Sequence, residues 1–328
     1  MSRIVITGGA GYIGSLLTGV LLDEGHEVRV IDALLHGGDS LISHIWNPRL
    51  RFLHGDVSQA GQWEDLVAEA EAIVHLAAIV GFPACRDVGE QVARRFNVEA
   101  VKRVFEAGKN AKRFVYSSTY SVYGVSPDGE AVTEESPLQP QSLYAETKVE
   151  AENYLRSVRD AGCAPVVFRF ATLYGVSPRT RFDLIVNQFV LEAMTNHKLV
   201  IFERDYNRSF VHIRDVIDAI RAALDAPDQK VRGETFNVGS DQGNHSKVDI
   251  VHRIQKQIPS VEIEYRDLTF GGDMRDVRVC YDKIERELGY RAERTVDQGI
   301  VEVRDAIANR LIAEPQLSRY RNHSFVVQ

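Results

Sequence analysis

Three side chains in the middle of the chain have the chemistry needed to oxidise an alcohol. Tyr144 and Lys148, in SLYAETK, are four residues apart and share one face of a predicted helix, and Thr119 ends the strand-like RFVYSST. A tyrosine of ordinary pKa near ~10 is a poor base, but a neighbouring Lys⁺ favours the tyrosinate. Tyr144 could then take a hydroxyl proton while Thr119 donates a hydrogen bond to the same oxygen. The alternative is an ordinary solvated Tyr/Lys pair on a helix.

A glycine-rich turn near the N-terminus supplies the matching cofactor site. Gly8, Gly11 and Gly14 follow the apolar run 4–7 and begin a helical pattern, with Tyr12 and Ile13 between the last two glycines. Glycine suits a sharp turn, close approach to a pyrophosphate and tight helix–strand packing, and the helix N-terminus attracts phosphate. The strand before the turn and the helix after it indicate a dinucleotide site.

Asp32 selects between the two nicotinamide cofactors. It ends the second predicted strand, eighteen residues after Gly14. A carboxylate there accepts hydrogen bonds from both adenosine ribose hydroxyls and repels a 2′-phosphate, which predicts NAD as the cofactor. The alternative for Asp32 is a strand-end turn residue.

Further cofactor contacts are predicted at the ends of later strands. Asp56 and Val57 follow a third strand and are placed to meet the adenine, although an N-cap explains Asp56 equally well. Small residues after the fourth strand would let the backbone pass close to the cofactor. The remaining predicted contacts are Leu76, Ala77, Ala78 and Ser117, together with Tyr144 and Lys148.

These residues require a parallel sheet to bring them together. Short apolar runs at 4–7, 27–31, 73–76, 114–117 and 166–170 alternate with helical patterns at 16–24, 91–108 and 146–161. Buried strands alternating with helices predict an α/β fold with a doubly wound parallel Rossmann sheet. We expect an NAD-binding domain from 1–174 plus 208–237. A smaller α/β substrate-binding region from 175–207 plus 238–315 would lie at its carboxyl edge, and 316–328 would form a C-terminal tail.

Bulk composition excludes several other functions. With 39 basic and 46 acidic residues the net charge is −7, which disfavours nucleic-acid binding. We find no apolar run long enough for a membrane span, and the N-terminus has no signal-peptide cleavage region. Cys85, Cys163 and Cys280 are widely spaced and give neither a disulfide framework nor a metal site. A cytoplasmic enzyme is expected.

The motifs together resemble one family. TGGAGYIG, Asp32, HLAA, YSSTYSVYG and YAETK, followed by NRSFVHIRDV and FNVGS, look like the extended short-chain dehydrogenase/reductases, and more narrowly like the nucleotide-sugar epimerase/dehydratase family. The resemblance implies that Tyr144 is the base, Lys148 lowers its pKa and orients the nicotinamide ribose, and Thr119 is the third member. It also implies that Asn97 supports the active-site helix.

The resemblance also implies a nucleoside-diphosphate sugar as substrate. Arg208 falls where the family has an arginine on the diphosphate, and Arg275 is similarly placed, with Arg278 as a weaker substitute. Phe270 stands where many relatives have an arginine, which weakens this clamp. A surface salt bridge is the alternative for all three arginines.

A second group of substrate residues is predicted in GVSPRTRFDLIVNQF. Arg179 and Asn187, with Arg181, could line the sugar or diphosphate pocket, and a solvated basic turn is the alternative. Cys85 lies close to the expected sugar position, although a lone cysteine is more often a packed small side chain.

Two positions after Thr119 bear on the reaction. The family's 4,6-dehydratases carry an Asp-Glu pair there, whereas this chain has Tyr120 and Ser121. Epimerisation at C4 through a 4-keto intermediate is therefore the leading hypothesis. An NAD-dependent 4-dehydrogenase or ketoreductase without epimerisation is the alternative, ahead of a 4,6-dehydratase, a non-catalytic NAD sensor, or an oxidoreductase acting on an amino acid or small alcohol. The resemblance further implies a homodimer formed through the helices at 91–108 and 146–161.

Overall fold

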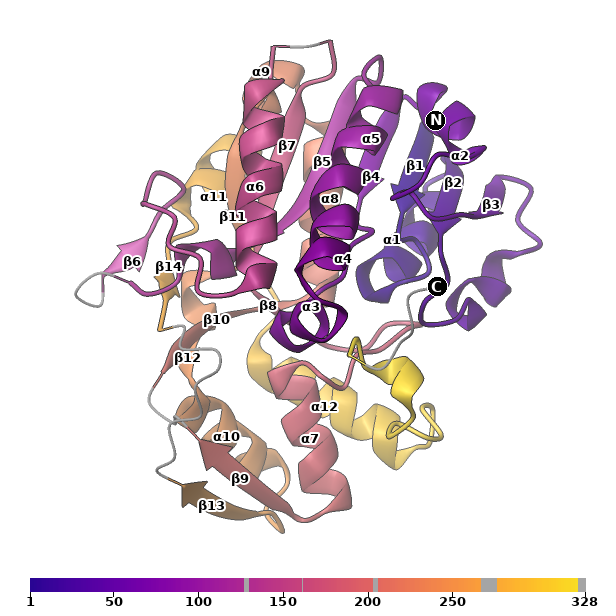
Figure 1. Ribbon diagram of the computed structural model, residues 1–328. Helices are drawn as coiled ribbons and strands as arrows, with labels where there is room; N and C mark the ends of the chain where they lie inside the picture. The colour runs from indigo at the N-terminus through magenta and orange to yellow at the C-terminus, as the bar shows by residue number, and fades with distance from the viewer. Residues whose placement is uncertain (127–129, 161, 203–205, 267–275, 324–328) are drawn as a thin grey trace.

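The larger part of the molecule is a sheet with helices on both faces, and a smaller group of helices and strands lies beyond one end of that sheet (Figure 1). The computed structural model describes residues 1–126, 130–160, 162–202, 206–266 and 276–323 of the 328-residue chain.

Seven parallel strands form the large sheet, in the spatial order β11-β7-β5-β4-β1-β2-β3. Their side chains alternate between the two faces, since Val166 and Phe168 join one buried apolar cluster and Val167 joins the other. The strands are β1 (Arg3–Thr7), β2 (Glu27–Asp32), β3 (Leu50–His54), β4 (Ala72–His75), β5 (Arg113–Thr119), β7 (Pro165–Phe170) and β11 (Thr235–Val238).

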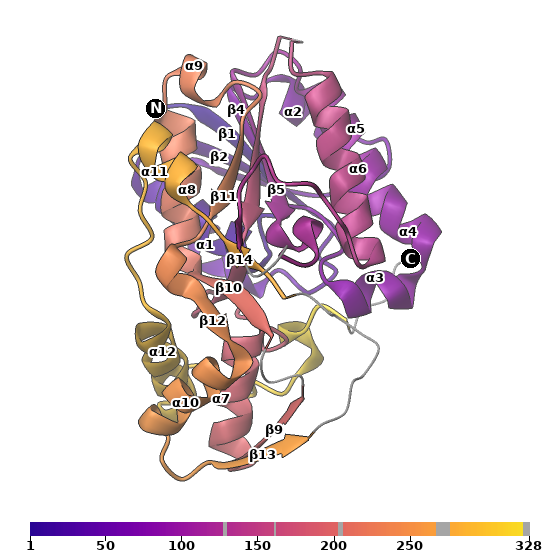
Figure 2. The ribbon, with the colours of Figure 1, turned by 90° about the vertical axis from the view of Figure 1, so that its left-hand side faces the viewer.

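Helices cover both faces of this sheet, as Figure 2 shows edge-on. On one face lie α1 (Tyr12–Asp23), α8 (Ile213–Asp225) and α11 (Asp282–Leu288), with the short α9 (Asp228–Val231) nearby. On the other lie α2 (Trp63–Ala68), α5 (Ala100–Ala107) and α6 (Leu143–Ser157). The strand order reverses between β1 and β4, which opens a crevice at the carboxyl ends of the strands. The predicted doubly wound Rossmann sheet is confirmed.

The helix predicted at 91–108 differs in detail. It is divided into α4 (Glu90–Arg94), a π-helical turn (Arg95–Glu99) and α5, and α3 (Phe82–Val88) precedes it. Asn97 lies in the π turn, where its Nδ2 donates to Thr147 Oγ1 on α6 at 3.1 Å and its Oδ1 accepts from the Ile79 amide at 2.8 Å. A π turn thus gives Asn97 a direct contact with the helix that carries Tyr144.

The smaller region has its own buried apolar cluster, built from residues between Tyr174 and Ile201 and from later segments. Three short strands form one of its sheets, in the order β12-β10-β8. Its elements are β8 (Thr172–Tyr174), α7 (Ile185–Thr195), β9 (Lys198–Phe202), β10 (Asn207–His212), β12 (Asn244–Ser246), α10 (Lys247–Gln257), β13 (Glu262–Arg266) and α12 (Val296–Ala308). A separate two-stranded pair, β6 (Ala131–Val132) and β14 (Arg278–Val279), lies beside the large sheet.

The predicted boundary at residue 208 falls inside β10, which pairs with β8 and β12 rather than with the large sheet. α8 and β11, which follow, lie with the large sheet. The described part of the predicted tail packs against its own chain: a 3-10 turn at Ser318–Tyr320 lies against the loop at 177–183. In the described ranges, no helix has the length and apolar character of a membrane span.

Candidate active site

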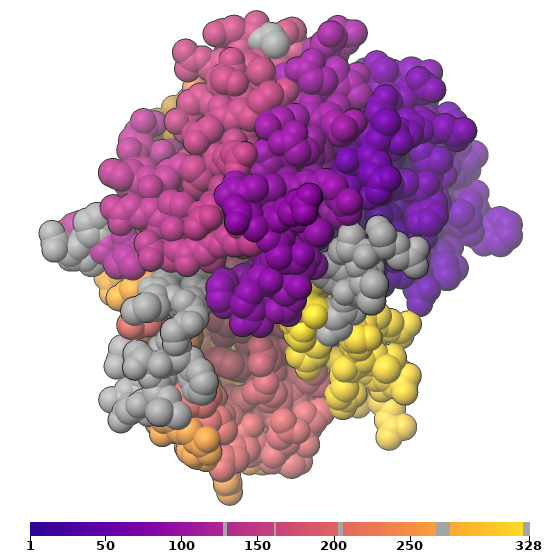
Figure 3. Space-filling view, viewed as in Figure 1, coloured from indigo at the N-terminus to yellow at the C-terminus, as the bar shows by residue number. Residues whose placement is uncertain are grey.

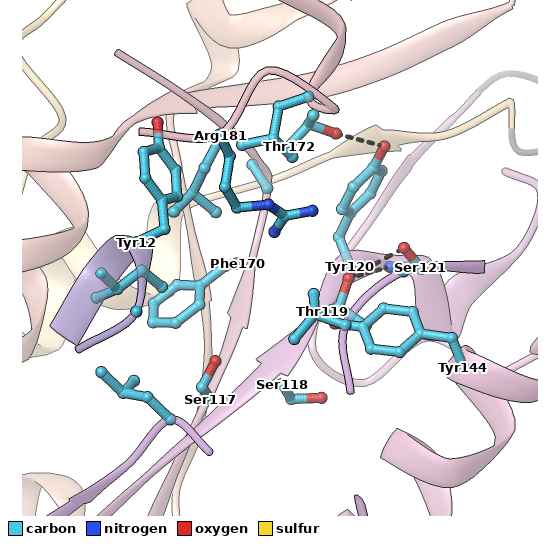
Figure 4. Close-up of a pocket in the computed structure, with 18 of the residues that line it drawn as sticks. Tyr12, Ser117, Ser118, Thr119, Tyr120, Ser121, Tyr144, Phe170, Thr172 and Arg181 are labelled. Atoms are coloured by element: carbon cyan, nitrogen blue, oxygen red, sulfur yellow. Dashed lines mark hydrogen bonds between the residues drawn. The ribbon is translucent and has the colours of Figure 1, made fainter. Parts of the chain in front are cut away.

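Two adjoining pockets follow the carboxyl ends of the strands and share Gly8, Gly11 and Leu76. The catalytic pocket lies between the glycine turn, the end of β5 and the start of α6 (Figure 4). The adenosine pocket lies between the glycine turn and the ends of β2, β3 and β4. The predicted contacts Tyr12, Ile13, Gly14, Ser117, Thr119 and Tyr144 line the first pocket, and Asp32, Asp56, Val57, Ala77 and Ala78 line the second.

The glycine turn leaves room for a dinucleotide. A Cβ at Gly14 would lie 2.3 Å from the Gly8 carbonyl oxygen, and a Cβ at Gly8 would lie 2.7 Å from the Ala77 amide nitrogen. Gly8 also has φ +75, a conformation that favours glycine. A Cβ at Gly11 would meet only the Gly8 oxygen, at 3.1 Å, so its other side opens into both pockets. The turn thus fits close approach of a pyrophosphate to the start of α1.

Asp32 is held at the end of β2 by two backbone amides. Ala10 N and Leu34 N donate to its carboxylate at 2.9 and 2.8 Å. Burial raises the pKa of Asp32, and these hydrogen bonds and the charge of Arg179 oppose the shift. The carboxylate is therefore oriented along the adenosine pocket, where ribose hydroxyls can donate to it. Asp56 faces the same pocket and accepts from Ser58 N at 2.8 Å in a turn; the N-cap of α2 is Gln62, so the alternative of Asp56 as an N-cap is wrong.

The adenosine pocket also contains a histidine that the sequence analysis did not select. His36 lines this pocket, and burial together with the charges of Arg179 and Arg181 lowers its pKa to about 3. A neutral imidazole thus stands beside the predicted ribose site. His36 lies four residues beyond Asp32, and a solvent-exposed loop residue could not be told from a pocket residue by spacing alone.

The predicted catalytic residues come together from two neighbouring elements. Thr119 is the last residue of β5, and Tyr144 is the second residue of α6, which begins at the Ser142 N-cap. Both line the catalytic pocket. Lys148, one turn further along α6, donates from Nζ to the Ser117 carbonyl oxygen at 2.7 Å, and its ammonium lies 6.0 Å from the centre of the Tyr144 ring.

The electrostatics of Lys148 suit a pKa-tuning role. Burial lowers the pKa of Lys148 to about 8, against the raising effects of Cys85 and Glu152. The ammonium therefore stays charged at neutral pH although it is 2% exposed. A buried positive charge this close to a phenol favours its ionised form. Cys85 is itself buried, donates to the Ile79 carbonyl oxygen at 3.3 Å and does not line the catalytic pocket.

A buried ion pair connects the elements that carry the predicted catalytic residues. Glu152, one turn beyond Lys148 on α6, accepts from Arg169 Nη2 on β7 at 2.6 Å and from the Ser118 hydroxyl next to Thr119. Both charged side chains are 1% exposed. Arg169 also donates to Tyr123 Oη at 2.9 Å. The pair fixes α6 against β5 and β7, and therefore Tyr144 against Thr119.

The two positions that follow Thr119 carry no carboxylate. Tyr120 Oη and Thr172 Oγ1 are hydrogen-bonded at 3.0 Å, and Ser121 Oγ accepts from Thr119 Oγ1 at 3.0 Å (Figure 4). Of the described residues that line the catalytic pocket, none is Asp or Glu. This pocket thus offers hydroxyl groups, the Tyr144 phenol and one guanidinium.

That guanidinium belongs to Arg181, which is directed into the catalytic pocket (Figure 4). Asp183 accepts from Arg181 Nε and Nη2 at 3.0 and 2.8 Å. The sequence favoured Arg179 over Arg181 as the substrate residue, because spacing in an irregular loop does not tell which of two arginines points inward.

The predicted substrate residues are dispersed. Arg179 is buried beneath the C-terminal segment, and its Nη1 donates to Asn322 Oδ1 at 2.6 Å. Asn187 supports the loop at 175–181, accepting from Gly175 N at 3.0 Å and donating to the Arg181 carbonyl oxygen at 2.9 Å. Arg208 is 2% exposed on β10. None of these three lines either pocket. Arg275 lies outside the described residues. So does Phe270, the position at which many relatives have an arginine. Arg278 is on β14, away from both pockets.

Comparison with known proteins gives one family and more than one reaction. The sequence profile of the NAD-dependent epimerase/dehydratase family matches residues 4–239. A UDP-glucose 4-epimerase of Corynebacterium glutamicum is 28% identical, over 92% of this chain and 94% of its own. A dTDP-glucose 4,6-dehydratase of Streptomyces niveus is 30% identical, over 92% and 91%. The structure of a UDP-glucuronic acid 4-epimerase from Bacillus cereus with UDP-glucuronic acid and NAD has a TM-score of 0.81 at 26% identity, over 94% of this chain and 99% of that one.

Proposed function

This chain belongs to the NAD-dependent epimerase/dehydratase family, and we propose that it interconverts the C4 epimers of a nucleoside-diphosphate sugar. It is an NAD-dependent enzyme, as its family and the relatives that bind NAD establish. The similarity to UDP-glucose and UDP-glucuronic acid 4-epimerases supports epimerisation. The chain is also similar to a 4,6-dehydratase, so the choice between the two reactions depends on the residues of the site.

The catalytic pocket supplies the groups that a reversible oxidation at C4 needs. NAD, held along the glycine turn and beside Asp32, would supply the reversible acceptance of a hydride from C4. Tyr144, ionised beside the Lys148 ammonium, takes the proton of the 4-hydroxyl. The Thr119 hydroxyl, which donates to Ser121 Oγ in this structure, turns to donate to the same substrate oxygen. After the 4-keto sugar turns over in the pocket, Tyr144 gives the proton back.

One observation carries the choice of reaction: no Asp or Glu is found in the described lining of the catalytic pocket. Elimination of water from C5–C6 needs an acid and a base of its own in addition to the base at O4. Tyr120 and Ser121 occupy the positions where these would stand, and both hydroxyls are engaged with Thr172 and Thr119. The pocket is thus suited to proton transfer at one oxygen.

A panel of UDP-, GDP-, CDP- and dTDP-sugars tests the proposal, with products followed by mass and NMR and NADH by its absorbance. The expected result is a C4 epimer of unchanged mass, with no accumulation of NADH. Stoichiometric NADH without an epimer would make the enzyme a 4-dehydrogenase or ketoreductase instead. A product lighter by one water would make it a dehydratase.

The diphosphate part of the proposal depends on Arg208 and Arg275. We propose that Arg208, buried on β10 in the smaller region, binds the diphosphate, and that Arg275 assists it. The double variant Arg208→Met/Arg275→Met should raise KM for the nucleotide sugar far more than it lowers kcat. Unchanged KM would show that the substrate carries no diphosphate. A homodimer and a cytoplasmic location stay predictions, the first of which light scattering can test.

A further inference from the structure

The last described residues of the chain contact both walls of the cofactor cleft. Arg319 Nη1 forms an ion pair with Asp39 Oδ2 at 3.0 Å, across 280 positions of sequence. Asp39 directly follows the loop 33–38, most of which lines the adenosine pocket. On the other side, in the loop at 177–183, whose Arg181 lines the catalytic pocket, Phe182 N donates to the Tyr320 carbonyl oxygen at 2.9 Å, and the two rings meet edge to face. Figure 3 shows these C-terminal residues, in yellow, where the indigo N-terminal part meets the smaller region.

Asn322 connects this segment to the two arginines of the loop at 177–183. Its Oδ1 accepts from Arg179 Nη1 at 2.6 Å, and its backbone amide donates to Asp183 Oδ2 at 3.2 Å. Asp183 in turn holds Arg181 through two hydrogen bonds, and Arg181 lines the catalytic pocket. A single residue of the C-terminal segment thus supports one arginine directly and the other through a carboxylate.

The side chains that form these contacts are buried, so the loss of one partner would leave buried polar groups without a hydrogen bond. Arg179, Arg181 and Asn322 are 5%, 9% and 8% exposed. Within the described part of the chain, Arg179 Nε has no hydrogen-bond partner, and Nη2 has only the Arg321 carbonyl oxygen at 3.5 Å. Asn322 Oδ1 is therefore the main acceptor for this guanidinium, and removing it would leave a buried charge poorly compensated.

The charge of Arg179 also reaches the cofactor site. Arg179 acts on Asp32, the carboxylate placed for the adenosine ribose, and opposes the rise that burial causes in the pKa of Asp32. Burial lowers the pKa of Arg179 itself to about 10, which leaves it a cation at neutral pH. The position of Arg179, set by Asn322, therefore helps to keep Asp32 ionised and able to accept hydrogen bonds from ribose hydroxyls.

We propose that residues 319–322, here called the C-terminal clasp, are positioning residues that keep NAD bound by holding the loop at 177–183 against the loop at 33–39. Moving these two loops apart breaks the contacts of Arg319, Tyr320 and Asn322 together. The contacts of the clasp do not depend on the proposed function, but their benefit does rest on it. An epimerase that returns the same hydride to its substrate gains from a cofactor that stays bound.

The rate of NAD dissociation tests the clasp without any sugar substrate. Asn322→Leu removes the acceptor of Arg179 at nearly constant size, and we expect NAD to dissociate at least about tenfold faster, with less NAD retained after purification. Asn322→Asp keeps an acceptor and should retain NAD. Gln316→Leu is the matched control, since Gln316 is exposed on the same segment and makes no hydrogen bond within the described residues; it should leave NAD dissociation unchanged.

Wild-type NAD dissociation in both Asn322→Leu and a chain ending at Leu317 would overturn the proposal. If Asn322→Leu does not fold, the exposed pair replaces it: Arg319→Asp should speed NAD release, and Arg319→Asp with Asp39→Arg should restore it. A restored ion pair without restored retention would also count against the clasp. Because NAD release is measured without turnover, absence of an epimer product would overturn the proposed function and leave the clasp standing.

Discussion

The catalytic end and the adenosine end of the cleft are built in different ways. Thr119, Tyr144 and Lys148 stand on β5 and α6, regular elements fixed to each other by the buried Glu152–Arg169 pair. At the adenosine end, Asp32 stands on a strand, but the charge of Arg179 that acts on it comes from an irregular loop, which Asn322 of the C-terminal segment holds. One end depends on secondary structure and the other on contacts between distant segments.

This difference separates proton transfer, at the catalytic end, from retention of the cofactor, at the adenosine end. A proton transfer needs atoms held within a fraction of an ångström, and a helix and a strand joined by a buried ion pair supply that rigidity. Binding and release of a cofactor need a wall that can open, and a loop held by a few side-chain contacts can do so. Five predictions, in decreasing order of expected effect, test how the two ends behave.

Tyr144→Phe should abolish proton transfer while leaving the adenosine end intact. Removal of the base should lower kcat about 10³-fold, with NAD content and thermal stability unchanged. Steady-state kinetics with the epimerised sugar and NAD released by denaturation measure the two effects. A loss of bound NAD equal to the loss of rate would show that the two ends are not separate.

Glu152→Gln should weaken the whole catalytic end. Arg169 would remain buried without its counter-charge, so the free energy of unfolding should fall by about 3–5 kcal/mol in urea denaturation. The matched control is Glu150→Gln on the same helix, whose partner Arg94 is partly exposed, and whose loss should cost at most about 1 kcal/mol. Equal effects of the two substitutions would contradict a special role for the buried pair.

Asp32→Asn should act on the adenosine end alone. Hydrogen bonds from ribose hydroxyls to a carboxylate are stronger than those to an amide, so NAD affinity should fall about 10- to 100-fold, with kcat at saturating NAD unchanged. Titration calorimetry measures the affinity. Asp56→Asn serves for comparison and should have a smaller effect, because Ser58 and Gln59 already donate to that carboxylate.

The pH dependence of kcat should report the pKa of Lys148. That pKa lies at about 8 because of burial, so the ammonium that supports tyrosinate is lost as pH rises through 8, and kcat should fall about tenfold between pH 7 and 9. Lys148→Arg, charged throughout this range, should remove the fall even if its rate is lower. If kcat of Lys148→Arg still falls between pH 7 and 9, the titration belongs to a group other than Lys148.

The same shift carries a prediction of the opposite sign for stability. In the unfolded chain Lys148 regains its usual pKa, so between pH about 8 and 10.5 the unfolded state binds more protons than the cofactor-free folded state. Lys148 should therefore make folding more favourable as pH rises through that range. Urea unfolding at pH 8 and pH 10, compared between the parent and Lys148→Met, measures this contribution, and an equal change in both proteins would rule it out.

Short-range patterns were sufficient for most of the fold. Five predicted strands form nearly where expected, because continuous apolar runs such as VVF in β7 are buried on both faces. The helix predicted at 91–108 has a π turn around Asn97 because that side chain bonds to Ile79 and Thr147, contacts that periodicity does not contain. The boundary at residue 208 fell inside β10 because strand pairing with β8 and β12 is a long-range choice.

The sequence by itself determined the Tyr144–Lys148 pair, Thr119, the glycine turn and Asp32, because each depends on the period of a helix, the end of a strand or a turn that only glycine can make. Tertiary structure alone decided which arginine faces the catalytic pocket, that Glu152 and Arg169 are paired, and that Asn322 supports Arg179. These depend on contacts between residues up to hundreds of positions apart. Such contacts form only after the packed sheet has brought distant segments together, and local sequence patterns do not specify the distances between those segments.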